Sequence, residues 1–223
     1  AASDVYKRQR VILTEGGSMT DIYVYNQLTK DNNGNIKVDQ NGNLGITSSN
    51  TPVKVGNLDA DFNLGWTNHF TYKEIDLGVV LSARVGGLAY SATQGILDYY
   101  GVSGTSATAR DNGGIPINNG KVNAQKYYQT IGTGEGGYGR YYLYSATNVR
   151  LQELSLNYTL PKRWFKNVAN VTLGIVGRNL WMLYCKAPFD PESTASTGTY
   201  NQGMDYFMQP SLRSMGFSAK ISF

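Results

Sequence analysis

Few side chains in this sequence could carry out catalysis, and those few do not form a recognisable catalytic arrangement. His69 is the only histidine, and the sequence offers it neither a second metal ligand nor a partner for a catalytic triad. Asp190 and Glu192 could be compared with the carboxylate pair of a glycosidase. Neighbouring carboxylates in a proline-containing turn are, however, more typical of a structural role. We therefore predict no catalytic residue, no metal, no cofactor and no enzymatic activity.

Three further motifs invite a chemical interpretation that their surroundings do not support. Gly134–Gly139 matches the dinucleotide fingerprint GxGxxG, but that motif requires a strand before it and a helix after it; the sequence Arg-Tyr-Tyr-Leu-Tyr that follows favours a loop. Asp31, Asn33 and Asn35 resemble the start of a calcium loop, but no glutamate closes it, so we predict an Asx-rich turn. Cys185 is the only cysteine, which excludes an internal disulfide.

The strongest pattern in the chain is alternation of apolar and polar residues with period two, which predicts β-strands. Phe62–Tyr72 and Ile75–Val85 form a predicted hairpin with a tight turn at Lys73-Glu74, and each strand is about 11 residues long, enough for a tilted strand to cross a bilayer. Further strands are predicted at Asn148–Thr159 and Asn170–Tyr184 and within Ser211–Phe223.

The two faces of these strands differ in a way that favours a membrane barrel over a soluble sandwich. The polar faces carry mainly Gly, Ser, Thr and Asn rather than Lys and Glu, and aromatic residues lie near strand ends, as in the interfacial girdles of outer-membrane barrels. Only 16% of residues are charged. His69, Arg84 and Arg178 fall on the polar face, which we expect to line the lumen. A wall charge satisfied by water or a nearby carboxylate is the plainer interpretation of the two arginines.

The lengths of the connections predict how the strands are oriented. Lys73-Glu74 and Pro161–Ala169 are short, whereas Gly86–Thr147 and Lys186–Pro210 are long. In an antiparallel order both short connections fall at one end of the sheet and both long ones at the other. Outer-membrane barrels have this asymmetry, with short periplasmic turns and long extracellular loops.

The remaining segments are less regular. We expect the tail of a strand at Arg10–Thr14, a short strand at Asp21–Thr29, a long loop with a small hairpin up to Pro52, and one short helix at Ala92–Tyr99 within the first long connection. Residues 1–9 resemble the translation of a sequencing adapter and are treated as a scar, so 10–223 would be the C-terminal part of a barrel domain. The formal net charge of +4 is too mild to predict a nucleic-acid partner.

Several sequence phrases resemble one family of transporters. Asn148–Pro161 is similar to a phrase in which a "VRL" strand leads into "GYTLP", Gly177–Leu180 and Phe189–Glu192 are similar to "GQNL" and "FDPE", and the chain ends on the expected Phe223. Gly65–Tyr72, Ile75–Leu77 and Gly86–Tyr99 also match. Together they resemble the C-terminal part of the SusC/RagA family, the TonB-dependent outer-membrane transporters of Bacteroidota. Asn157, Arg178 and Ser218 depart from the family pattern, which more often has Gly, Gln and Gly there.

This resemblance implies a fold, partners and a location. The fold would be all-β: antiparallel strands from the C-terminal part of a transmembrane barrel of about 22 strands, whose plug lies outside this chain. Phe217, Ile221 and Phe223 would form the C-terminal assembly signal. The partners would be outer-membrane lipid, a SusD-like surface lipoprotein, an oligosaccharide or peptide substrate, and TonB acting through the missing N-terminal region. Two alternatives remain: a TonB-dependent receptor for another ligand such as a siderophore, and a soluble or surface-attached all-β binding module.

Overall fold

The computed structural model describes residues 10–11, 15–136, 139–165, 168–193 and 203–222. The chain divides into two compact units. The sheet unit comprises residues 60–86, 146–192 and 209–223, and the loop unit comprises residues 1–59, 87–145 and 193–208. Each is assembled from three separate stretches of sequence, and each is described by itself below.

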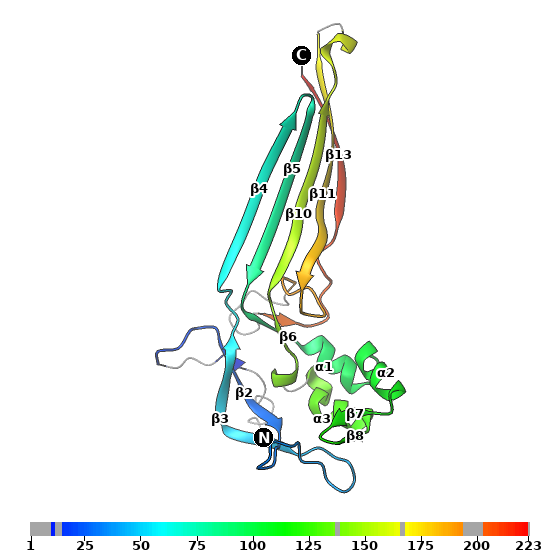
Figure 1. Ribbon diagram of the computed structural model, residues 1–223. Coiled ribbons are helices and arrows are strands. Elements are labelled where there is room, and N and C mark those ends of the chain that lie inside the picture. Colours follow the sequence, from blue (N-terminus) through cyan, green and yellow to red (C-terminus); the bar gives the residue numbers. More distant parts are fainter. Residues whose placement is uncertain (1–9, 12–14, 137–138, 166–167, 194–202, 223) are drawn as a thin grey trace. The chain divides into compact units, whose positions relative to one another are not determined.

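The sheet unit is an antiparallel sheet of five strands in the order β13-β11-β10-β5-β4 (Figure 1). Its strands are β4 (Phe62–Tyr72), β5 (Ile75–Val85), β10 (Asn148–Thr159), β11 (Asn170–Cys185) and β13 (Ser214–Ser222). Among these five, each strand pairs with the one before it along the chain, so the sheet is a meander. All five predicted strands are therefore confirmed, and β4, β5 and β10 have the predicted bounds.

The register confirms that the sheet has one apolar and one polar face. Phe70 pairs with Leu77, which pairs with Leu156, while on the opposite face His69 pairs with Gly78 and Gly78 with Ser155. One irregularity interrupts β10 between Leu151 and Glu153. This bulge adds one residue to β10 and so reverses the alternation. Arg150 consequently pairs with Ser82 on the polar face, although strict counting from Leu154 would have put it on the apolar face.

The connections within the sheet unit follow the predicted asymmetry. Lys73-Glu74 joins β4 to β5, and residues 160–169, which contain the 3₁₀ turn η2 (Lys162–Phe165), join β10 to β11. Both leave from the same end of the sheet, because Tyr72 and Ile75 lie in register with Tyr158. The two long connections, residues 86–147 and 186–213, leave from the opposite end, where Arg84 is in register with Asn148.

The loop unit contains more regular structure than expected from the sequence. Two three-stranded sheets are formed by β1 (Arg10–Val11), β2 (Asp21–Leu28) and β3 (Ile46–Asn57), and by β12 (Met204–Asp205), β6 (Leu88–Ser91) and β9 (Leu143–Ser145). A small hairpin joins β7 (Ile115–Ile117) and β8 (Gly120–Val122). Three helices, α1 (Ala92–Tyr99), α2 (Gly104–Asp111) and α3 (Ala124–Gly136), and the 3₁₀ turn η1 (Gly139–Tyr141) complete it.

The loop unit has its own hydrophobic core, so the long connection 86–147 is not the irregular loop that we expected. Leu28 and Leu44 from the first stretch pack with core residues of the second stretch, and Met204 from the third packs against the same cluster. The buried second-stretch members are Tyr90, Ala92, Ile117, Val122, Ile131 and Tyr142. The predicted helix at Ala92–Tyr99 is confirmed, with Ser91 as its N-cap. Helices α2 and α3 and strand β3 were not predicted.

None of the helices in the described part of the chain is long and apolar enough to cross a membrane.

Candidate functional site

The polar face of the sheet carries the three charged residues singled out from the sequence. His69 lies opposite Gly78, Arg84 opposite Asn63 on one side and Asn148 on the other, and Arg178 opposite Glu153. Arg178 forms an ion pair across the two strands, with its Nε 2.8 Å from Glu153 Oε2. The Arg178 side chain is 68% exposed, so this pair contributes little to stability. The three residues share a face without forming a common cluster.

Small residues on this face make room for the polar side chains beside them. A Cβ added at Gly78 would lie 2.5 Å from Ser155 Oγ and 3.1 Å from the His69 ring. A Cβ at Gly174 would meet Asn157 Oδ1 and would lie 2.6 Å from Ser218 Oγ. Polar side chains therefore fill the space beside these two glycines, which makes this part of the face hydrophilic. This is the character expected of a barrel interior.

Most large side chains of the apolar face are exposed or half-exposed, although Leu151 within it is buried. Its rows are set by register: Tyr72, Ile75 and Tyr158 form the row nearest the short connections, and Trp66, Leu81, Leu151 and Trp181 form another row further along. Tyr72 lies ten positions after Phe62 on β4, which corresponds to a band about 25 Å tall for a strand tilted by about 40°. Phe217, 71% exposed, and Ile221 also lie on this face; Phe223 lies outside the described residues. Such a face suits lipid.

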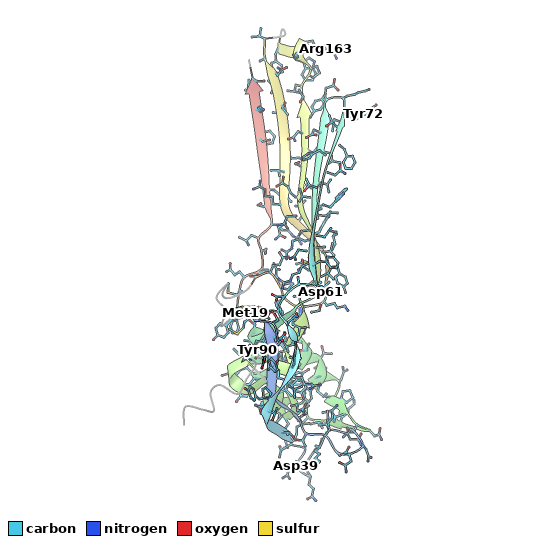
Figure 2. All side chains as sticks on the ribbon, turned by 90° about the vertical axis from the view of Figure 1, so that its left-hand side faces the viewer. Met19, Asp39, Asp61, Tyr72, Tyr90 and Arg163 are labelled. Atoms are coloured by element: carbon cyan, nitrogen blue, oxygen red, sulfur yellow. The ribbon has the colours of Figure 1, made fainter. Side chains whose placement is uncertain are left out.

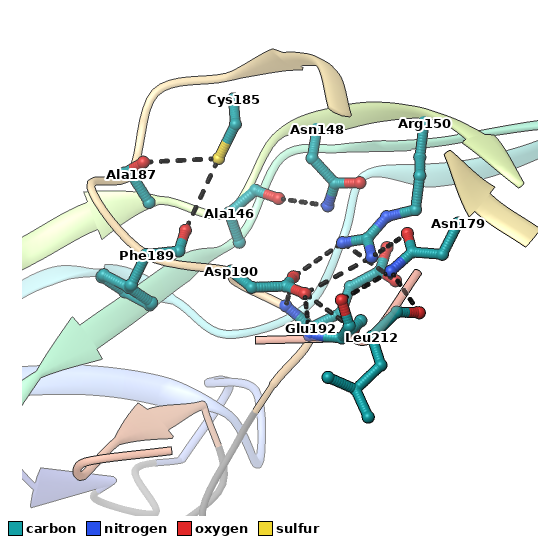
Figure 3. A network of polar contacts seen from close by, with 11 residues as sticks. Ala146, Asn148, Arg150, Asn179, Cys185, Ala187, Phe189, Asp190, Glu192 and Leu212 are labelled. Atoms are coloured by element: carbon teal, nitrogen blue, oxygen red, sulfur yellow. Dashed lines mark hydrogen bonds and ion pairs between the residues drawn. The ribbon is translucent and has the colours of Figure 1, made fainter. Parts of the chain in front are cut away.

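Arg150 is the centre of the most extensive polar network in the sheet unit (Figure 3). Its side chain is 2% exposed. Its Nη2 lies 2.6 Å from Asp190 Oδ1 and 3.5 Å from Glu192 Oε2, and its Nη1 donates to Asn179 Oδ1 at 3.0 Å. A buried guanidinium needs several acceptors such as these, because an uncompensated buried charge is costly.

The network also closes the base of the long connection between β11 and β13. Asp190 Oδ2 accepts hydrogen bonds from the Ser211 hydroxyl at 2.7 Å and the Ser211 backbone N–H at 3.1 Å. Asn179 donates to the backbone oxygens of Ser211 and Leu212. The two ends of the connection, at residues 190–192 and 211–212, are thereby held together and to strands β10 and β11. We call this set, Arg150, Asn179, Asp190, Glu192 and Ser211, the loop-base network.

The loop-base network explains the electrostatics of Asp190. Burial alone would raise the pKa of this carboxyl, but hydrogen bonds from Arg150, Ser211 and the Glu192 backbone lower it to about 2. Asp190 is therefore ionised at neutral pH. The structural interpretation of Asp190 and Glu192 from the sequence agrees with this arrangement: they contact a buried arginine rather than facing one another across a substrate site.

The network unites three phrases that were recognised separately in the sequence. Arg150 belongs to the "VRL" phrase, Asn179 to Gly177–Leu180 and Asp190 to Phe189–Glu192. Neither Arg150 nor Asn179 was predicted from the sequence as a site residue. One available signal was an arginine within a membrane-type strand, followed 40 residues later by a loop carboxylate. The bulge at Gln152 conceals which face of the sheet this arginine occupies, because it reverses the alternation.

The other motifs take structural roles. Asp31 Oδ1 accepts hydrogen bonds from the backbone N–H groups of Asn33 and Asn35, as expected for an Asx-rich turn. Gly134–Gly136 form the end of α3 rather than a loop, and residues 137–138 of that motif lie outside the described residues. No strand precedes the motif directly, so it lacks the setting of a dinucleotide site. The Cys185 thiol donates to the backbone oxygens of Ala187 and Phe189. Among the described residues, no group of three or more His, Cys, Asp or Glu is placed to hold a metal ion.

Comparisons with known proteins point to one class. No protein-family model matches the chain. The chain is 25% identical to TonB-dependent receptor P3 of Formosa agariphila over 242 aligned positions, covering 97% of the chain and 23% of that receptor. Its fold is similar to chains in two structures of the RagAB peptide transporter. The first, in the closed-closed state, has a TM-score of 0.55 and 17% identity over 96% of this chain and 22% of that one. The second has a TM-score of 0.50 and 16% identity over 91% and 23%.

The chain thus spans about a quarter of the length of the proteins that it matches. These matched proteins are receptors and transporters rather than enzymes. The meander of long strands with a largely exposed apolar face, the similarity to the receptor and the shared fold lead to one conclusion: the chain is part of an outer-membrane β-barrel similar to those of TonB-dependent receptors.

Proposed function

We propose that the protein containing this chain imports oligosaccharides or peptides across the outer membrane in a TonB-dependent manner, together with a SusD-like surface lipoprotein. The observation that carries the proposal is the two-faced sheet: an exposed apolar face suited to lipid and a polar face of small residues suited to a lumen. The similarity to a TonB-dependent receptor and to the RagAB fold supports the same function.

Within this proposal the two units have different tasks. The polar face, including His69, Arg84 and Arg178, forms part of the lumen wall. The loop unit lies on the extracellular side, because its second and third stretches belong to the long connections, and it provides contacts for the lipoprotein and the substrate. The loop-base network keeps the second long connection attached to the wall.

Deleting the gene in its native host and measuring uptake of labelled peptides and labelled oligosaccharides tests the function. We expect uptake of one of these two classes to be lost, to return on complementation, and to be lost equally in a strain without TonB. Loss of siderophore uptake instead would support the alternative receptor function. A full-length product that stays soluble without detergent would show that the membrane assignment is wrong.

A further inference from the structure

The end of the sheet that carries the short connections combines exposed aromatic and cationic side chains. The Lys73-Glu74 turn and the connection containing η2 are adjacent, because the Thr159 backbone N–H donates to the Glu74 oxygen at 2.8 Å just before that connection begins. Figure 2 shows Tyr72 and Arg163 at this same end of the sheet, while Asp61 lies at the opposite end of β4. We call Tyr72, Lys73, Lys162, Arg163 and Trp164 the turn-end belt.

The aromatic members of the belt are among the most exposed large side chains of the sheet unit. Tyr72 is 69% and Trp164 is 64% exposed. Tyr72 lies on the apolar face, in the last row before the turn. Tyr and Trp at this position are typical of the boundary between hydrocarbon and headgroups, where an amphipathic ring is favoured.

The cations of the belt lie at the same end of the sheet unit and are open to solvent. Lys73, Lys162 and Arg163 are all exposed. The Lys73 ammonium lies 5.2 Å from the centroid of the Tyr72 ring, which places it beside the apolar face. Within the described part of the chain, none of the three forms an ion pair, whereas Lys54, Arg150 and Arg178 each do. Glu74 is the only acidic residue of the two short connections.

We propose that the turn-end belt is a binding surface for the headgroups of anionic phospholipids. A phosphate at the hydrocarbon boundary would lie level with the rings of Tyr72 and Trp164 and within reach of the belt cations, whose aliphatic stems can lie along the apolar face. Arginine suits phosphate through its forked donors and lysine through its compact charge. The inference rests on the membrane setting of the barrel and is independent of what the protein transports.

Native mass spectrometry of the detergent-purified full-length protein, offered equal amounts of phosphatidylglycerol and phosphatidylcholine, tests the proposal. The wild type should retain phosphatidylglycerol in preference. The variant Lys73→Gln/Lys162→Gln/Arg163→Gln should bind it at least tenfold more weakly, since each cation near an anionic lipid surface is worth about a fivefold change in binding. Inorganic phosphate should not displace the lipid, because it lacks the acyl chains held beside the rings.

The control variant, Lys30→Gln/Lys37→Gln/Lys121→Gln, removes the same charge from exposed lysines of the loop unit and should keep the wild-type preference. Heat-modifiable gel mobility verifies that each variant is folded. Equal retention of the two lipids by the wild type, or equal loss in the two variants, would overturn the proposal. Uptake assays on the same proteins separate this outcome from a failure of the import function.

Discussion

At the scale of single residues, the Arg150–Asp190 contact should be the most costly to break, because both groups are buried. Arg150→Met leaves Asp190 buried without its countercharge, and we expect the loop base to lose about 3–5 kcal/mol of stability. Hydrogen exchange of residues 186–193 and 209–213 in the full-length protein measures this loss.

Two variants make that measurement specific. Arg178→Gln breaks an exposed ion pair and should change stability by at most about 1 kcal/mol. Arg150→Met/Asp190→Leu removes both charges and should recover part of the protection, since replacing a whole buried pair by apolar groups is far less costly than breaking it. Equal effects of Arg150→Met and Arg178→Gln would contradict the central role of Arg150.

The same network predicts a particular pH dependence. The pKa of Asp190 is lowered from 3.8 to about 2 in the folded state. A lowered carboxyl pKa contributes stability that is complete above the unfolded value and is lost as the pH falls through the folded value. Exchange protection of the Ser211 amide should therefore stay constant from pH 7 to about pH 4 and decrease between about pH 4 and pH 2. In Asp190→Asn, protection should be lower throughout and should not titrate in this range.

At the scale of strands, the pairing of β10 with β11 depends on a large residue facing a small one. Asn157 is directly opposite Gly174, and its side-chain oxygen occupies the space that a Cβ at Gly174 would need. Gly174→Asn should destabilise the folded barrel by about 1–3 kcal/mol through overpacking. The exchanged pair Asn157→Gly/Gly174→Asn should recover most of this loss, because neighbouring substitutions are not additive. Urea titration followed by unheated gel mobility measures both; equal loss in the two variants would show that the pair is not coupled.

The strands of the sheet unit could be predicted from the sequence because their pattern is local. Phe62–Tyr72 and Ile75–Val85 alternate at nearly every position, with Asn68 and Val80 as exceptions, and a two-residue turn leaves no other pairing. The register also follows, since one face must stay apolar. What alternation could not reveal is the bulge at Gln152, which changes the face of Arg150, so the loop-base network escaped prediction although all three of its phrases were recognised.

The loop unit escaped prediction for a different physical reason. Its core is assembled from residues as distant as Leu28, Ile131 and Met204, and no local window contains that information. Strand β3 is rich in Ser, Thr and Asn and is fixed by its pairing with β2 rather than by apolar alternation. Helix α2 is polar and begins at an N-cap, Ser103, whose hydroxyl accepts a hydrogen bond from the Ser106 backbone N–H. The regular structure here is a result of tertiary packing.

At the scale of the whole molecule, the environment of the apolar face separates a membrane barrel from a soluble sheet. Phe70 is half-exposed on that face, so Phe70→Lys would be harmless in water but should cost about 2–4 kcal/mol in a bilayer. Thr67→Lys, on the polar face of the same strand, should be tolerated. The fraction of folded protein recovered in outer-membrane preparations measures the difference, and equal recovery of the two variants would contradict the lipid-facing assignment.

The orientation of the barrel follows from the connections and can be tested by single-cysteine labelling. In a cysteine-free background that includes Cys185→Ser, Asp111→Cys places a thiol at the exposed end of α2 in the first long connection, and Glu74→Cys places one in the tight turn between β4 and β5. A membrane-impermeant maleimide should label Asp111→Cys on intact cells and Glu74→Cys only after the outer membrane is permeabilised, because short turns face the periplasm in this class of barrel. Labelling of Glu74→Cys on intact cells would reverse the orientation and move the turn-end belt to the outer leaflet. The loop unit could then no longer meet a substrate from outside, so this experiment tests the topology on which the division of tasks between the two units depends.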